Sequence, residues 1–206
     1  MKIIDYDKNL NKNKIALSAY NICNNASFPV DYNDVYEHLF GNDNAILKLL
    51  IDSKQDIKGF GVFENYILQL DTEIITMLYL SGMVIDKQYQ GKNISKSIIR
   101  NAYNQVFSDL ISLRTQNIAM AKSLLNTYPN NLFTIPGNNI NEQLINCLRE
   151  ANPFKNINNQ GVIKNCYPNQ LYYNLNAIKD NFGIELQPND SLAVVIKPNK
   201  KLILKK

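Results

Sequence analysis

Residues 77–102 read MLYLSGMVIDKQYQGKNISKSIIRNA, and this stretch decides how the rest of the chain is organised. An apolar run over residues 77–85 stops at a polar turn, and apolar residues then return at helical spacing, at Ile94 and Ile98. The pattern predicts a strand, a turn and the N-terminus of a helix. A turn such as residues 90–95 can direct several backbone N–H groups and the positive end of the helix dipole at one point. We interpret it as a candidate anion-binding turn.

The residues before this stretch alternate between apolar runs and turn-forming clusters. Runs typical of strands cover residues 46–51, 57–70 and 74–85. Three neighbouring strands with short connections predict an antiparallel meander. The third run is apolar at nearly every position, which is typical of a central strand covered on both faces.

The residues after the turn predict a crossover. The helix predicted from residue 92 to about residue 107 is followed by a short apolar run, residues 110–113, then by a polar junction at residues 114–117 and a further helix through residue 125. A strand, a helix and a strand in this order join two parallel neighbours of a sheet. The predicted crossover places the candidate turn at the carboxyl end of the central strand.

The N-terminal region predicts one short strand and two helices. Residues 2–5 form the predicted strand, and Asp7 or Asn9 then provides the N-cap of a helix that runs to about Ile22. Asp31 provides the N-cap of the second helix.

The C-terminal third is harder to assign. It predicts strands at residues 132–135 and 191–196 and an amphipathic helix at residues 141–150. The type of the segments between residues 161 and 182 stays open. With 206 residues the chain can bury one sizeable core, and we expect a single domain over residues 1–206.

Composition narrows the class of protein. No run reaches the roughly 18 to 20 consecutive apolar residues of a membrane helix, and residues 1–9 lack the apolar centre of a signal peptide. We therefore expect a cytoplasmic protein that does not bind a membrane. Cys23, Cys147 and Cys166 are odd in number and widely spaced, so they predict neither a disulfide framework nor a metal site.

The charge pattern disfavours nucleic acid as a partner. The net charge of +4 is spread along the chain, except for the lysine-rich residues 197–206, and no basic helix carries interleaved aromatic residues. A nucleic-acid-binding protein that uses this lysine-rich segment remains a minor alternative.

The turn at Gln90 resembles the acyl-CoA-binding motif of the GNAT superfamily of N-acyltransferases, Gln/Arg-x-x-Gly-x-Gly/Ala. Gln90 stands at the first position, Asn93 at the first glycine and Ser95 at the final Gly/Ala. Asn is the non-glycine residue that best tolerates a left-handed backbone, so Asn93 can hold the same turn. Ser95 is small enough to allow a phosphate to approach closely. The order of helices and strands around the motif is also similar to that superfamily.

The resemblance implies an α/β (α+β) fold. It has a mixed, mostly antiparallel central sheet flanked by helices, followed here by a C-terminal extension. Residues 136–190 have no counterpart in a minimal GNAT domain, and we expect this insertion or extension to lie on the acceptor side.

The resemblance also implies a cofactor site and a reaction. The backbone amides of five residues would bind the CoA pyrophosphate, namely Gly91, Lys92, Asn93, Ile94 and Ser95. Met83 and Ile85 would pair with the pantetheine arm, and a backbone N–H near Val84 would stabilise the oxyanion of the thioester carbonyl. Asn117 would contact the cofactor arm, or else cap a helix. The implied reaction is direct transfer of an acetyl or other acyl group from acetyl-CoA to an amine, with no metal.

The acid and the base of that reaction are harder to assign. Many GNAT proteins place a tyrosine acid where this chain has Leu124, and Tyr128 lies four residues later on the same predicted helical face. No acidic residue lies between Glu73 and Asp86 on the central strand, so Glu64 is the candidate base, acting through water. Glu73 and His38, the only histidine, are further candidates. Three tyrosines either line an acceptor pocket or serve in packing: Tyr167, Tyr172 and Tyr173.

Two functions therefore stay open. The first is an acetyl-CoA-dependent N-acetyltransferase that acts on a small-molecule amine or a protein amine, as a monomer or a homodimer. The second is a catalytically inactive GNAT-fold protein that serves as an acyl-CoA sensor or an interaction module. The position of Leu124 and the strand without a carboxylate favour the second.

Overall fold

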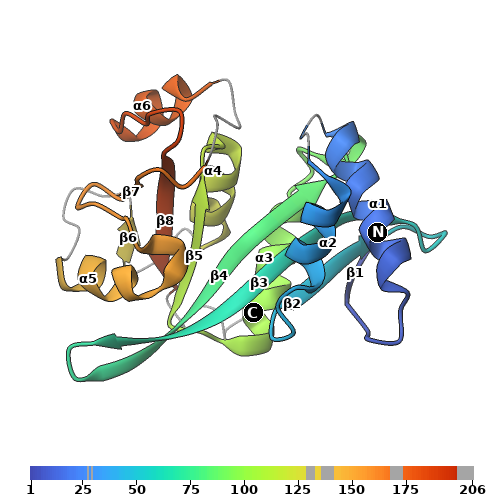
Figure 1. Ribbon diagram of the computed structural model, residues 1–206, viewed down its shortest axis with the longest axis horizontal. Coiled ribbons are helices and arrows are strands. Elements are labelled where there is room, and N and C mark those ends of the chain that lie inside the picture. The colour runs from blue at the N-terminus through green and yellow to red at the C-terminus, as the bar shows by residue number, and fades with distance from the viewer. Residues whose placement is uncertain (27, 29, 129–132, 136–141, 168–173, 199–206) are drawn as a thin grey trace. The chain divides into compact units, whose positions relative to one another are not determined.

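The computed structural model describes residues 1–26, 28, 30–128, 133–135, 142–167 and 174–198. The chain forms two compact units, each described by itself: Met1–Asn65 with Leu80–Phe107, and Tyr66–Tyr79 with Ser108–Lys206. In chain order the elements are β1 Lys2–Asp5, α1 Lys12–Asn25, α2 Tyr32–Phe40, β2 Ile46–Ile51, β3 Ile57–Leu70, β4 Glu73–Ile85, η1 Lys87–Tyr89, α3 Ile94–Val106, β5 Leu110–Thr115, α4 Ile118–Thr127, β6 Phe133–Ile135, α5 Glu142–Glu150, η2 Asn152–Phe154, β7 Val162–Ile163, α6 Asn176–Phe182 and β8 Ser191–Lys197 (Figure 1).

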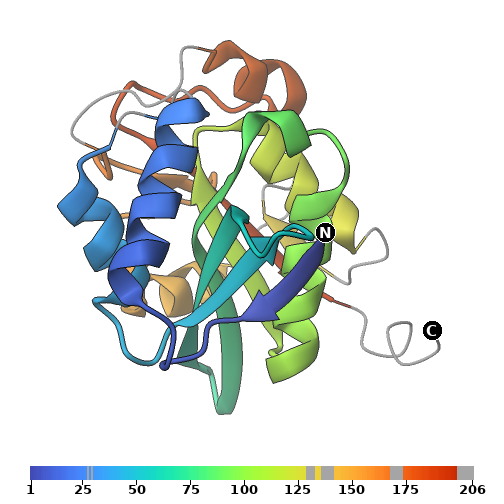
Figure 2. The same cartoon turned by 90° about the vertical axis from the view of Figure 1, so that its right-hand side faces the viewer.

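The first unit is a sheet covered on both faces. Strands β1, β2, β3 and the end of β4 follow one another in the sheet, and β1–β2 and β2–β3 are antiparallel. Helices α1 and α2 lie on one face of this sheet and α3 lies on the other (Figure 2). The strands supply alternate side chains to each face, because successive residues of a strand point in opposite directions.

Two sets of buried side chains hold this unit together. Leu47 and Leu49 of β2 and Val62 of β3 belong to one cluster with the buried faces of α1 and α2. On α3 the buried residues recur at helical spacing, as the sequence predicted, and are Ile98, Ile99, Ala102 and Tyr103.

Helix α1 begins later than predicted. The carboxylate of Asp7 accepts a hydrogen bond from the N–H of Asn9 at 2.9 Å, and the Asp7 carbonyl accepts one from Leu10 N–H. These bonds close a separate turn, so the predicted caps Asp7 and Asn9 are wrong. Asn11 is the N-cap, and its side chain accepts from Lys14 N–H at 3.1 Å. The predicted cap of α2 is confirmed, since Asp31 accepts from Asn33 N–H at 2.7 Å.

The second unit is organised around β8. Strand β5 pairs with one edge of β8 in antiparallel register, from Ile111↔Ile196 to Thr115↔Leu192, and β6 and β7 pair with β8 on its other edge. Residues 191–196 of β8 are all buried. Helix α5 packs on this sheet in a cluster that includes Leu148, Phe154 and Val195.

Most predicted strands are confirmed, and the fold class is as expected. The pairs whose register is given above are all antiparallel, in a sheet flanked by helices. Strand β5 extends to Thr115 rather than ending at residue 113, because Arg114 and Thr115 continue the pairing with β8. The region left open by the sequence contains β7 and the short helix α6. Among the described residues, no helix is long and apolar enough to cross a membrane.

Candidate functional site

The turn after β4 is held by short-range hydrogen bonds. Asp86 caps the 3-10 helix η1, since its carboxylate accepts from Gln88 N–H at 3.2 Å and its carbonyl accepts from Tyr89 N–H at 2.8 Å. Its own N–H donates to the Lys58 carbonyl on β3 at 2.9 Å. The end of β4 and the start of the turn are therefore fixed to the neighbouring strand.

Gln90 closes the turn from within. Its Nε2 donates a hydrogen bond to the carbonyl oxygen of Ile85 at 2.8 Å, five residues back along the chain. In this geometry the side chain stabilises the backbone of the turn, and the backbone in turn forms the surface that an anion would meet.

Two residues of the turn have a left-handed backbone. Gly91 has φ +76° and Asn93 has φ +58° and ψ +17°. The conformation predicted for Asn93 is confirmed. A side chain of ordinary shape would strain either position, because positive φ brings Cβ close to the following carbonyl.

Helix α3 begins directly after Asn93, whose side chain makes no cap hydrogen bond. The first intrahelical bond runs from Ser97 N–H to the Asn93 carbonyl at 3.2 Å, so the N–H groups of Ile94 and Lys96 precede the helical ladder. Residues 91–93 are exposed and residues 94–96 are partly exposed. The N-terminus of α3 is thus open to solvent at its positive end.

The side chains around this N-terminus add positive charge. Lys92 and Lys96 flank it, and its first turn contains no acidic residue. The Lys92 ammonium lies 5.3 Å from the centre of the Tyr89 ring, a cation–π contact that keeps the charge beside the turn. Open amides, a helix dipole and two lysines together suit a phosphate or pyrophosphate.

The last residues of β4 are half-buried and lie on alternate faces of the sheet. Met83 is directed to the α3 face, where a Cβ on Gly61 would lie 3.3 Å from its Cε and 2.9 Å from Ile98 Cγ2. Val84 packs against the cluster formed with α1 and α2. A Cβ on Gly59 would lie 3.0 Å from the Val84 carbonyl, so the glycine lets β3 approach closely there.

Asn117 belongs to the second unit and is the N-cap of α4. Its Oδ1 accepts a hydrogen bond from Ala119 N–H at 2.8 Å, and its own N–H donates to Thr115 Oγ1 at 2.8 Å. The helix-cap interpretation is confirmed. The side-chain Nδ2 is a separate donor that takes no part in the cap.

The two positions considered for the acid are both at α4. Leu124 is fully buried, with 0% of its side chain exposed. Tyr128 is the C-cap residue that follows the last turn of α4, and only 8% of it is exposed. Helix α4 runs to Thr127, two residues beyond the predicted end at residue 125.

The candidate bases are spread over three elements. Glu64 is half-buried on β3, and Glu73 is exposed at the start of β4. His38 is exposed near the end of α2, and a Cβ added to Gly82 of β4 would overlap its Nε2. The sequence did not predict that His38 contacts β4. The signal was Gly82 itself, because a glycine inside an apolar strand often marks the close approach of another group.

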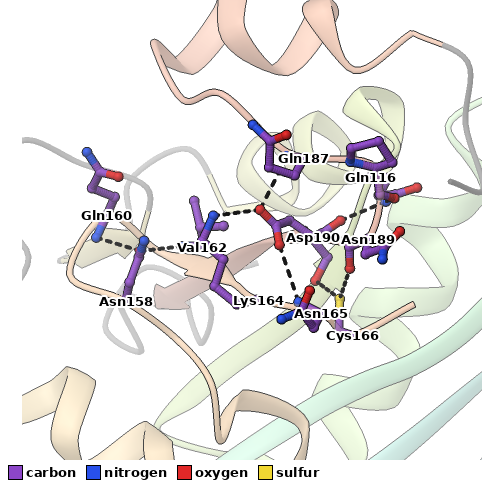
Figure 3. A network of polar contacts seen from close by, with 12 residues as sticks. Gln116, Asn158, Gln160, Val162, Lys164, Asn165, Cys166, Gln187, Asn189 and Asp190 are labelled. Carbon is purple, nitrogen blue, oxygen red and sulfur yellow. Dashed lines mark hydrogen bonds and ion pairs between the residues drawn. The ribbon is translucent and has the colours of Figure 1, made fainter. Parts of the chain in front are cut away.

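A polar network in the second unit orders the segment that leads to Tyr167 (Figure 3). Asp190 is 2% exposed, and its carboxylate accepts from Lys164 Nζ at 2.7 Å and from the N–H groups of Asn165 and Gln187 at 3.2 Å. Gln116 Nε2 donates to the Pro188 and Asp190 carbonyls, each at 2.7 Å. The sequence did not predict this network, which joins residues far apart in the chain.

Backbone hydrogen bonds next to this network also hold Tyr167, a candidate residue of the acceptor pocket. The N–H groups of Cys166 and Tyr167 both donate to the Asn189 carbonyl, at 2.9 and 3.1 Å. The Arg114 guanidinium lies 5.6 Å from the centre of the Tyr167 ring. Tyr172, Tyr173 and the lysine-rich residues 199–206 lie outside the described residues.

The cysteines and acidic groups form no metal centre in the described part of the chain. No group of three His, Cys, Asp or Glu side chains there could hold a metal ion. Cys23, Cys147 and Cys166 are free thiols. Burial raises the pKa of the Cys23 thiol to about 11, and burial also raises the pKa values of Cys147 and Cys166.

Comparison with known proteins gives a match by structure. No protein-family model matches the sequence, and no curated protein does. The ribosomal-protein-S18-alanine N-acetyltransferase of Escherichia coli superposes with a TM-score of 0.54 at 11% identity, over 96% of this chain and 94% of that one.

Two further solved structures are similar. A protein assigned as a phosphinothricin N-acetyltransferase gives a TM-score of 0.52 at 11% identity, over 97% of this chain and 99% of that chain. A chain of the NatC complex, solved with a Gag peptide and CoA, gives 0.50 at 13% identity, over 96% and 99%. The protein therefore has the fold of the GNAT N-acyltransferases.

Proposed function

We propose that the protein transfers an acyl group, most simply acetyl, from acyl-CoA to an amine. The observation that carries this proposal is the turn between β4 and α3. It combines a left-handed Asn93 whose side chain does not cap α3, a solvent-exposed α3 N-terminus and flanking lysines, on the fold of known N-acetyltransferases. The backbone amides of residues 91–95 bind the pyrophosphate of CoA.

The end of β4 binds the rest of the cofactor in this proposal. Main-chain groups of Met83 and Ile85 pair with the pantetheine arm, and a backbone N–H near Val84 donates to the thioester carbonyl. A donor fixed in advance at this point lowers the barrier by about 3 kcal/mol, because it stabilises the oxyanion as the charge develops. Asn117 Nδ2 contacts the cofactor arm while Oδ1 caps α4. The structure of NatC with CoA supports the choice of cofactor.

The reaction needs two proton transfers. The amine nitrogen forms the new bond to the carbonyl carbon, the carbon–sulfur bond breaks, and the thiolate takes a proton. We assign the acid to Tyr128, and Glu64, acting through water, is the carboxylate candidate for the base. The half-buried position of Glu64 on β3 supports this candidate. Residues 136–190 provide the acceptor side, and the acceptor is a small-molecule or protein amine.

One observation favours the inactive alternative. Leu124 is fully buried where the resemblance implies an acid, and Tyr128 lies beyond the last turn of α4. A protein of this kind would bind acyl-CoA and transfer nothing.

Two measurements separate the possibilities. Calorimetry with acetyl-CoA tests the site, and absence of heat at millimolar ligand would refute both functions. Thiol release from acetyl-CoA is then followed with spermidine, kanamycin, lysine ethyl ester and a peptide with an N-terminal alanine. Release above the amine-free rate supports transfer, whereas binding without release from any of these amines favours the sensor.

A further inference from the structure

The His38 side chain packs against β4 at Gly82, where any larger residue would overlap it. It is the only histidine in the chain and lies exposed on α2. A Cβ on Gly82 would overlap its Nε2 and would lie 3.0 Å from Cδ2 and 3.1 Å from Cε1. The imidazole therefore points Nε2 toward β4, while the residue as a whole is exposed to solvent.

This contact at Gly82 lies two residues along β4 from Val84, near which the thioester is proposed to bind. Gly82 and Val84 are two residues apart on β4, so their side-chain positions share a face and lie about 6.6 Å apart. Val84 packs against the α1 and α2 cluster, which identifies that face as the one His38 covers. Nε2 therefore lies no more than about 9 Å from the side-chain position of Val84, a distance that an amine and one water can span.

We propose that His38 takes the proton from the attacking amine, an inference that rests on the proposed function. As the nitrogen bonds to the thioester carbon and the carbon–sulfur bond breaks, the proton on nitrogen passes to Nε2, directly or through one water. The exposed imidazole then returns it to solvent. An imidazole suits this step because it titrates near neutral pH, whereas an exposed carboxylate is a weak base there.

Several other titratable groups share this region and must be separated from His38. No acidic or basic side chain lies on β4 between Glu73 and Asp86. The Glu37 carboxylate is directed elsewhere, since a Cβ on Gly41 would lie 2.9 Å from its Oε2. The titratable side chains on the neighbouring elements are Tyr32, Asp34, Tyr36 and Glu37 of α2, Lys12, Lys14, Tyr20 and Cys23 of α1, and Lys58, Glu64 and Tyr66 of β3. Glu37→Gln is the matched control for the charge of α2, and Glu64→Gln tests the carboxylate candidate for the base.

The first test needs no acceptor. A protein with one histidine gives one imidazole signal by NMR, and acetyl-CoA is compared with adenosine 3′,5′-bisphosphate, which lacks the pantetheine arm. At equal saturation by calorimetry, acetyl-CoA should shift the His38 signal and the bisphosphate should leave it unmoved. If acetyl-CoA binds and the signal stays fixed, His38 is not at the thioester and the inference is wrong. If acetyl-CoA does not bind, the proposed function itself fails.

The second test uses the panel amine that releases thiol fastest. His38→Gln should lower kcat about 100-fold, abolish the acid limb of the rate profile and leave the Kd of acetyl-CoA within about twofold. Glu37→Gln should leave both the limb and kcat in place. Gly82→Ala should also lower kcat, because its methyl group displaces the imidazole. If His38→Gln keeps the native kcat, His38 is not the acceptor of the amine proton. The same conclusion follows if the acid limb survives in His38→Gln and is lost in Glu64→Gln. Thiol release from no amine in the native protein also overturns it.

Discussion

The side-chain amide of Gln90 donates a 2.8 Å hydrogen bond to the carbonyl oxygen of Ile85. The last residue of β4 and the first residue of the motif are thereby joined across η1. The glutamine stabilises the loop whose backbone is proposed to bind the pyrophosphate, so its contribution to binding is indirect.

Replacing Gln90 should weaken cofactor binding without removing it. In Gln90→Leu the turn loses a bond worth about 1 kcal/mol, so the Kd of acetyl-CoA should rise about fivefold. Gln88→Leu is the matched control, because the exposed Gln88 amide makes a longer bond, at 3.4 Å, to the Asp86 carboxylate. Calorimetry on both variants checks the prediction. Equal affinities in the two variants would show that the bond to Ile85 does not matter for binding.

Asn93 should be replaceable by glycine but not by a β-branched residue. Asn93→Gly keeps the backbone at φ +58°, whereas Asn93→Val should lower the free energy of unfolding by about 1 to 2 kcal/mol. Lys92→Val is the control, because Lys92 is exposed and not among the residues with positive φ. Urea unfolding gives the three values. Equal stability of the Asn93→Val and Lys92→Val variants would contradict the left-handed assignment.

The helix cap and the proposed cofactor contact of Asn117 can be tested separately. Asn117→Ala loses the cap on Ala119 N–H and should cost about 1 kcal/mol of folding stability. Asn117→Asp keeps the acceptor and should retain the stability, but it lacks the Nδ2 donor. Urea unfolding and acetyl-CoA calorimetry are run on both variants. If Asn117→Asp binds acetyl-CoA as tightly as the native protein, Nδ2 has no part in cofactor binding.

Asp190 should be the most sensitive charged residue of the second unit. Asp190→Ala removes the acceptor for Lys164 and for two backbone N–H groups in a site that is 2% exposed, so the loss should be about 3 kcal/mol. Glu185→Gln is the control, because its pair with Lys179, at 3.4 Å, is exposed on both sides and should change stability by less than about 0.5 kcal/mol. Urea unfolding distinguishes them, and similar losses would contradict the role of burial.

The thiols should react in an order set by burial. With a pKa of about 11, about one Cys23 thiol in a thousand is ionised at pH 8, and the side chain is 2% exposed. Cys166 is only half-buried and should react first with a disulfide reagent, whereas Cys23 should react only after urea unfolding. Peptide mapping after labelling identifies the sites. Loss of the fast phase in Cys166→Ser is expected, and fast labelling of Cys23 in the folded protein would be the contrary result.

Local rules account for the turn. The apolar run, the break and the return of apolar residues at helical spacing predicted β4 and α3, and the tolerance of Asn for positive φ predicted the backbone of Asn93. These features depend on residues within one or two turns of chain, which is why the sequence was sufficient. The cap of α1 failed for a local reason too, since Asp7 satisfied its neighbours in a separate turn and Asn11 took its place.

The sequence by itself determined most of the strands and helices and the left-handed turn that begins α3. Only the tertiary structure decided which side chains meet. It placed His38 of α2 against Gly82 of β4. It also brought Gln116 to the Asp190 carbonyl and Lys164 to the Asp190 carboxylate. The residues in each pair are 26 to 74 positions apart in the sequence. Such contacts depend on how helices pack on a sheet and how strands are paired, and neither is encoded in the periodicity of a single segment.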